Sequence, residues 1–122
     1  MRKIKSLVLS VMGLLCCMSV SAHDFEVDGI YYNITSQADK TVAVTHWGDD
    51  PYNDYTNVYY GEVKIPESVT YSGNTYSVTS IGFSAFYDCS SLSSVEIPNS
   101  VTSIGVFAFY ECTSLTSVEI PN

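Results

Sequence analysis

Apolar and polar residues recur in the same order along two consecutive segments of the chain, residues 77–99 and 100–122. The two segments are identical at 18 of their 23 positions. A period of this length is typical of solenoid proteins, in which each repeat forms one turn of a coil. Because a single unit cannot bury its apolar side, we expect the two units to stack on each other.

The end of each unit has the pattern of a short strand. Val95 and Ile97 alternate with Glu96, which predicts a half-buried strand with the glutamate facing solvent. Pro98 ends this strand because proline has no amide hydrogen for a continuing ladder. Residues 100–104 form a second short extended stretch.

The middle of each unit has a different period. After Gly105, apolar residues recur at spacings near 3.6, at Ala108, Phe109, Cys112 and Leu115. This spacing predicts a short helix or helical turn over residues 106–112. Together with the strands, it predicts an α/β solenoid.

Stacked strands lie about 4.8 Å apart, so equivalent apolar side chains of the two units should pack on each other. We expect Val95 over Val118, Ile97 over Ile120 and Phe86 over Phe109. The predicted core of the two units consists of Ile81, Phe86, Cys89, Leu92, Val95, Ile97, Ile104, Phe109, Cys112, Leu115, Val118 and Ile120.

The segment before the repeats contains a partial copy. Residues 63–69 match residues 95–101 at five of seven positions, and residues 71–76 then read as a hairpin with Gly73 and Asn74 at its turn. We interpret residues 63–76 as an atypical first rung, since terminal repeats often diverge.

Residues 23–62 are expected to form a small antiparallel β cap over the end of the solenoid. Apolar and polar residues alternate over 25–28, further strands are predicted at 30–34 and 41–47, and Asp28 and Gly29 mark a hairpin turn. Such a cap would cover strand edges that could otherwise pair with other chains. A polar loop follows at residues 48–57.

Residues 1–22 have the layout of a secretory signal peptide. Basic residues at the start precede an apolar run and small residues, which predicts cleavage after Ala22 and a secreted or cell-surface protein. An uncleaved anchor is the alternative. Cys16 and Cys17 allow a lipoprotein, but neither follows a small residue, so lipid anchoring is disfavoured.

The chain is acidic, with 13 acidic and five basic residues and a formal charge of −8. Three of the five basic residues lie in the expected signal peptide, so the mature chain would keep only Lys40 and Lys64. A field of this sign repels phosphate backbones and anionic lipid, which argues against nucleic acid and membrane surfaces as partners. It favours basic partners or divalent cations.

The second repeat is followed by no cap motif, whereas arrays usually need about three units and a capped terminus. We expect either that the chain is the N-terminal part of a longer array or that its last rung is completed by another chain. The second case would be an end-to-end self-association.

The repeat pattern resembles that of the BspA-like bacterial leucine-rich repeat family. The resemblance rests on residues 97–121, with Ile97 and Pro98 at the start, Ile104 and Gly105 in the middle, and a terminal Ile120, and it occurs twice. The family's members are typically exported surface proteins, and several are adhesins that bind host matrix proteins or other bacteria. The resemblance therefore implies a protein-binding or adhesion module.

Two ladders of equivalent residues are candidate binding surfaces. Tyr87 and Tyr110 could stack and bind side chains or sugars, or they could only cover the edge of the core. Glu96 and Glu119 could form an acidic stripe for a basic ligand, or only a solvated face.

The cysteines, the acidic loop and the search for catalytic motifs add no strong candidate for a functional site. Cys89 and Cys112 are equivalent, and we favour apolar core packing over a disulfide or a metal site. Asp49, Asp50 and their neighbours in the polar loop lack the spacing of an EF-hand, so no metal site is predicted. The sequence contains two histidines and no catalytic motif, so we predict neither an enzyme nor a cofactor. A structural spacer without a ligand remains the alternative function.

Overall fold

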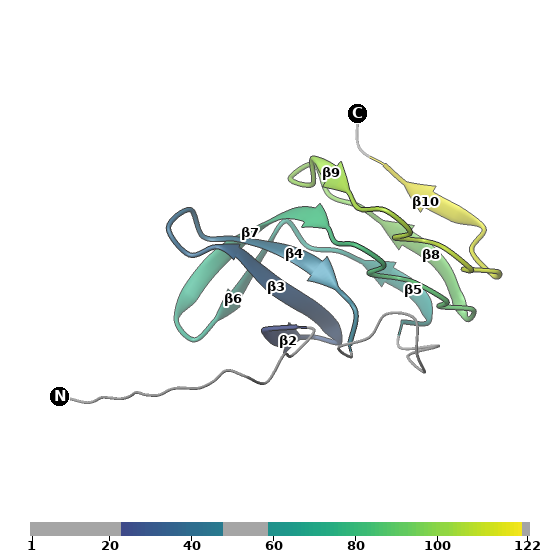
Figure 1. Cartoon of the computed structure of the whole chain (residues 1–122), viewed down its shortest axis with the longest axis horizontal. Coiled ribbons are helices and arrows are strands. Elements are labelled where there is room, and N and C mark those ends of the chain that lie inside the picture. The colour runs from purple at the N-terminus through teal and green to yellow at the C-terminus, as the bar shows by residue number, and fades with distance from the viewer. Residues whose placement is uncertain (1–22, 48–58, 121–122) are drawn as a thin grey trace, which may run out of the picture.

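The computed structural model describes residues 23–47 and 59–120 (Figure 1). The expected signal peptide at 1–22 and the polar loop at 48–57 therefore lie outside the described residues, as do the acidic side chains weighed as a calcium loop. Within the described ranges the chain forms two sheets joined by turns.

The first sheet has six strands and contains the N-terminal antiparallel strands. Asp28 and Gly29, both with positive φ, form the predicted tight turn between the first two of them. The strands in chain order are β2 (Phe25–Val27), β3 (Ile30–Ser36), β4 (Thr41–Thr45), β6 (Ser68–Tyr71), β7 (Asn74–Ile81) and β9 (Ser103–Ile104).

The hairpin expected at residues 71–76 is formed by β6 and β7, but its turn is displaced by one residue. Tyr71 pairs with Asn74, so the turn residues are Ser72 and Gly73 rather than Gly73 and Asn74. Ser72 and Gly73 both have positive φ, as a two-residue hairpin turn of this hand requires. Asn74 stays extended and continues the ladder.

Strand β7 connects the N-terminal strands to the repeats. Val78 of β7 pairs in parallel with Val42 of β4, and Ile81 pairs in parallel with Ile104 of β9. Because β7 runs from the hairpin into the first repeat, the backbone has no break where the predicted first rung and first repeat meet.

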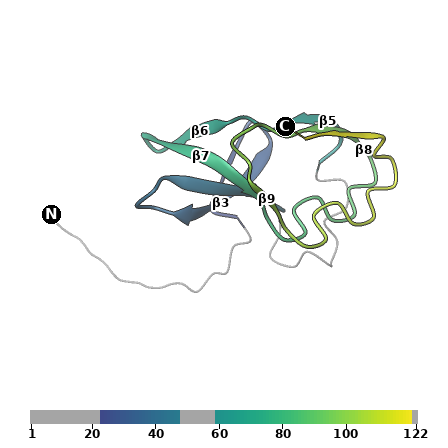
Figure 2. The ribbon, with the colours of Figure 1, turned by 90° about the horizontal axis from the view of Figure 1, so that it is seen from above.

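The second sheet contains three parallel strands, one from each turn of the coil. They are β5 (Gly61–Lys64), β8 (Leu92–Glu96) and β10 (Ser117–Glu119). Val63, Val95 and Val118 are aligned across the three strands, which confirms the predicted stacking of Val95 and Val118. Figure 2 shows the repeats as successive turns seen from above.

The short helix or helical turn predicted over residues 106–112 is not confirmed, because the described residues contain no helix. Residues 83–88 and 106–111 form consecutive turns, interrupted by positive φ at Ser84, Asp88, Phe107 and Glu111. No helix of the described ranges is therefore long and apolar enough to cross a membrane. The fold here is a repeat solenoid of strands and turns, rather than an α/β one.

Hydrogen bonds between rungs explain why turns replace the helix. The amides of Ser84, Phe86 and Asp88 donate to the carbonyl oxygens of the next rung over 2.7–3.0 Å. The backbone thus satisfies its donors across rungs, and the apolar period near 3.6 reflects side chains directed inward from successive turns.

Burial follows the predicted core in the first repeat and decreases in the second. All six predicted core residues of the first repeat are buried, namely Ile81, Phe86, Cys89, Leu92, Val95 and Ile97. In the second repeat Phe109, Cys112, Leu115 and Val118 are partly buried, whereas Ile104 and Ile120 are exposed. The difference arises because the second repeat packs on only one neighbouring rung among the described residues.

Ser84 is a locally unfavourable position within the first repeat. Its side chain is fully buried, its hydroxyl has no hydrogen-bond partner in the described part of the chain, and its φ is 55°. A buried unpaired hydroxyl costs about 1–3 kcal/mol. A left-handed conformation adds about 1–2 kcal/mol for a residue with a β-carbon.

We therefore expect Ser84→Gly to raise the free energy of unfolding by about 1 kcal/mol, after allowing for the larger backbone entropy of glycine. Thermal unfolding should show a melting temperature about 4–8 °C higher. Ser84→Ala is the control, because it removes the hydroxyl and keeps the strained backbone, so it should gain less. An unchanged or lower melting temperature for Ser84→Gly would contradict the assignment of strain to this residue.

Candidate functional site

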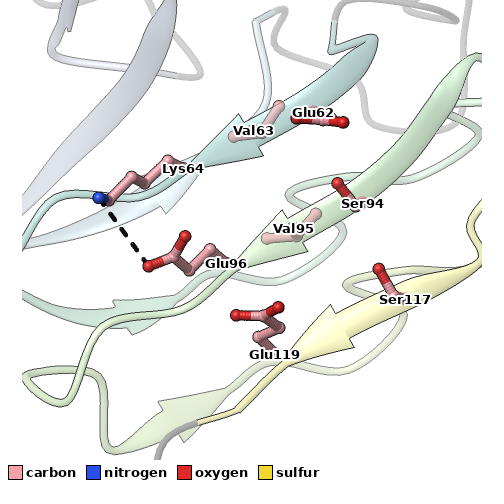
Figure 3. Close-up of a pocket in the computed structure, with 8 residues that line it drawn as sticks. All are labelled: Glu62, Val63, Lys64, Ser94, Val95, Glu96, Ser117 and Glu119. Carbon is pink, nitrogen blue, oxygen red and sulfur yellow. Dashed lines mark ion pairs between the residues drawn. The ribbon is translucent and has the colours of Figure 1, made fainter.

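The outward face of the parallel sheet carries aligned polar side chains from all three strands. Alternation along each strand directs valines into the core and polar residues to solvent. The register places Lys64, Glu96 and Glu119 in one row across the sheet (Figure 3). Glu62, Ser94 and Ser117 form the second row. The face lines a shallow hollow of about 460 Å³.

This outward face carries three carboxylates and one ammonium group. The Lys64 Nζ lies 4.0 Å from a carboxylate oxygen of Glu96, and both side chains are more than half exposed. Such an exposed pair contributes little to stability. Because Glu62 and Glu119 add two further negative charges, the face retains a net negative charge for a basic ligand to meet.

The predicted tyrosine ladder forms on another side of the coil. The rings of Tyr87 and Tyr110 are stacked with centroids 5.4 Å apart, and Phe107 packs edge-on against Tyr110 at 5.3 Å. These residues belong to the turn segments, which lie away from β5 and β8 (Figure 2). The structure therefore does not bring the tyrosine and glutamate ladders together.

The two cysteines of the repeats are free thiols. Cys89 is buried, and burial raises its pKa to about 11. The Cys112 thiol is half-buried and donates a hydrogen bond to the carbonyl oxygen of Phe86 at 3.0 Å, and burial raises its pKa as well. Both groups are therefore protonated at neutral pH, which supports packing rather than nucleophilic or metal chemistry.

Tyr59 connects the N-terminal strands to the first repeat, and sequence reasoning did not identify it. Its hydroxyl donates to the carbonyl oxygen of Thr45 at 2.6 Å and accepts from the amide of Tyr31 at 3.0 Å. Its ring lies 4.7 Å from that of Phe86. Burial raises the pKa of Tyr59 far above its ordinary value, so it stays a neutral hydrogen-bonding residue. A single tyrosine after a polar loop carries no pattern that would have revealed this contact.

The described residues contain no group of three histidine, cysteine or acidic side chains placed to hold a metal ion. His23 uses its Nδ1 for a 2.7 Å hydrogen bond with the carbonyl oxygen of Trp47. The polar groups of the outward face lie on an open surface, where they can contact another macromolecule but do not enclose a small substrate.

Sequence comparison relates the repeats to a known family. Residues 55–122, more than half of the chain, match the family described as "BspA type Leucine rich repeat region (6 copies)". No curated protein matches the chain.

Three solved structures resemble the chain. A leucine-rich repeat protein from Bacteroides ovatus is 37% identical, with a TM-score of 0.67 over 81% of this chain and 24% of that one. A leucine-rich cell surface protein from Faecalibacterium prausnitzii is 32% identical, with a TM-score of 0.62 over 82% and 24%. A leucine-rich repeat protein from Bacteroides capillosus is 33% identical, with a TM-score of 0.60 over 78% and 63%. The chain spans about a quarter of the length of the first two.

Proposed function

The chain belongs to the BspA-type leucine-rich repeat family, and on this basis we propose that it is a protein-binding module acting at the bacterial cell surface. The proposal includes export by the N-terminal segment and adhesion to a host matrix protein or another surface protein. The relative from Faecalibacterium prausnitzii, described as a cell surface protein, supports this location. No catalytic activity is proposed.

The observation that carries the proposal is the acidic outward face of β5, β8 and β10. Glu96 and Glu119 lie side by side on neighbouring hydrogen-bonded strands, so they can contact a partner with little loss of backbone freedom. An open face suits a protein surface better than a small molecule. We propose that the partner presents basic side chains there.

We also propose that β2, β3 and β4 cap the coil. The parallel pairing of β4 with β7 supports this role, and so does Tyr59, whose hydroxyl bonds to β3 and β4 while its ring packs against Phe86 of the first repeat. In this arrangement the repeats that follow the cap would extend the outward face.

The test is binding to a panel of purified extracellular matrix proteins in surface plasmon resonance. The double variant Glu96→Gln and Glu119→Gln should bind at least about fivefold more weakly than the unchanged chain, and salt should weaken binding of the unchanged chain. Because the substituted side chains are exposed, thermal unfolding should be unchanged.

The double variant Tyr87→Ala and Tyr110→Ala serves as the comparison. If this pair weakens binding and the glutamine variant does not, the partner binds the stacked tyrosines, which is the second candidate surface. If no member of the panel binds, the spacer becomes the better description of this part of the chain.

A further inference from the structure

Strand β5 leaves one edge without a strand partner among the described residues, since it is the outer strand of its sheet and pairs only with β8. The amide of Ile65 donates to the carbonyl oxygen of Glu96 in β8, and the amide of Gly61, before the register shift between Gly61 and Glu62, donates to that of Ser91. Because backbone hydrogen bonds alternate along a strand, the amides of Glu62 and Lys64 are directed to the opposite edge. That edge lies on the side nearest β3 (Figure 1).

A groove of about 440 Å³ runs beside this edge. One wall is β5, with Glu62 and Lys64, and the other is the hairpin turn at Asp28 and Gly29. Tyr60, whose side chain is 71% exposed, also lines it. A second hollow of about 450 Å³ continues the groove past Asp28 and Lys64 and is lined by apolar residues that include Val27, Pro66 and Val69.

We propose that an extended segment of a partner protein, with lysine or arginine alternating with apolar residues, adds to the β5 edge as a further strand in this groove. Main-chain hydrogen bonds to Glu62 and Lys64 would hold the segment. Its basic side chains would lie near the carboxylates of Asp28 and Glu62, and near the Tyr60 ring.

The charge of the groove favours a basic segment, and the position of the β5 edge keeps the groove accessible. The groove has two carboxylates and one ammonium group, in a chain with a formal charge of −8, so a basic segment is favoured over an acidic one. The edge faces the N-terminal strands, so rungs added after β10 would leave it accessible. The groove lies beside the outward face and shares Glu62 and Lys64 with it, whereas Glu96 and Glu119 line only the outward face.

The probe is a fluorescein-labelled, end-capped hexapeptide in which lysine alternates with valine, measured by fluorescence anisotropy. We expect saturable binding to the full chain. The same peptide with alternate amides N-methylated should bind at least about tenfold more weakly, because the ladder cannot form. Glutamate in place of lysine should have a similar effect. Equal binding of the methylated peptide, or no binding of the lysine peptide, would overturn the proposal.

Two variants at Lys64 separate the contribution of the main-chain amide to peptide binding from that of the side-chain charge. Lys64→Pro removes the outward amide and leaves the bonds to β8, as proline on an edge strand allows. Lys64→Ala removes the same charge and keeps the amide. The proline variant should bind the lysine peptide about tenfold more weakly than the alanine variant. Equal affinities would overturn the proposal, and if the proline variant fails to fold, the methylated peptide decides.

Two further controls separate this site from the outward face. Asp28→Asn should weaken peptide binding about three- to fivefold, because it removes one carboxylate of the groove. The double variant Glu96→Gln and Glu119→Gln should leave peptide binding within about twofold of the unchanged chain. Peptide binding lost in that double variant and kept in Asp28→Asn would place the peptide on the outward face and contradict the groove assignment.

Discussion

Replacing Phe86 with alanine is expected to lower the free energy of unfolding by about 3–5 kcal/mol, the usual cost of removing a buried aromatic ring. The Phe86 side chain is fully buried, stacks on Phe109 with ring centroids 5.1 Å apart, and packs against Tyr59. Its loss opens a cavity where the repeats meet the N-terminal strands. Urea unfolding followed by circular dichroism measures the change.

Phe109→Ala is the matched control, because Phe109 occupies the same position of the next repeat and is only partly buried. Its effect should be about half as large or less, since less surface is returned to water. Equal losses for the two variants would show that the two rungs are equally enclosed, contrary to the burial described above.

Replacing Gly105 with alanine is expected to lower the free energy of unfolding by about 2–3 kcal/mol, as overpacking against a fixed backbone does. A β-carbon at this position would lie 2.7 Å from the amide nitrogen of Phe83 and 2.8 Å from the carbonyl carbon of Gly82. Both are backbone atoms of the preceding rung, so relief requires the rungs to separate. The hydrogen bond from the Gly105 amide to Ile81 would then lengthen from 2.8 Å.

Val106→Ala, at the adjacent and 64% exposed residue, is the control and should change stability by less than about 0.5 kcal/mol. Both variants can be compared in the same urea series. A stability for Gly105→Ala equal to that of the Val106→Ala control would mean that the rungs are more loosely stacked than the structure indicates.

The repeat and its stacking were predictable because burial imposes the same pattern on each turn of the coil. Alternation around Glu96 correctly indicated a strand with its carboxylate outward, and identity between the copies indicated that Phe86 stacks on Phe109. The turn signal at Asp28 and Gly29 was equally specific, because few residues tolerate positive φ.

The sequence alone could not show that residues 106–111 form consecutive turns and not a short helix. Inward-facing residues of consecutive turns have nearly the same spacing as one face of a helix, and periodicity alone does not separate the two. The left-handed conformations that decide the matter occur at Ser84, Asp88, Phe107 and Glu111, none of which is glycine. The hydrogen bonds that favour these turns come from the neighbouring rung.

The sequence predicted the candidate surfaces only as pairs of equivalent residues in the two repeats, without the other residues that surround them. Sequence equivalence identified Glu96 and Glu119 as neighbours, but Lys64 and Glu62 joined them only through the register of β5 with β8. The groove beside β5 depends on how the N-terminal hairpin packs against the coil, a long-range contact without a sequence pattern. The same applies to Tyr59.

Hydrogen–deuterium exchange tests the proposed binding surface most directly. The full chain is measured alone and with a saturating amount of the matrix protein that binds it in surface plasmon resonance. We predict that binding slows exchange of amides in β5, β8 and β10 and leaves the turns at 83–88 and 106–111 unchanged. Slower exchange confined to those turns, or no slowing in any segment, would contradict binding at the outward face of β5, β8 and β10.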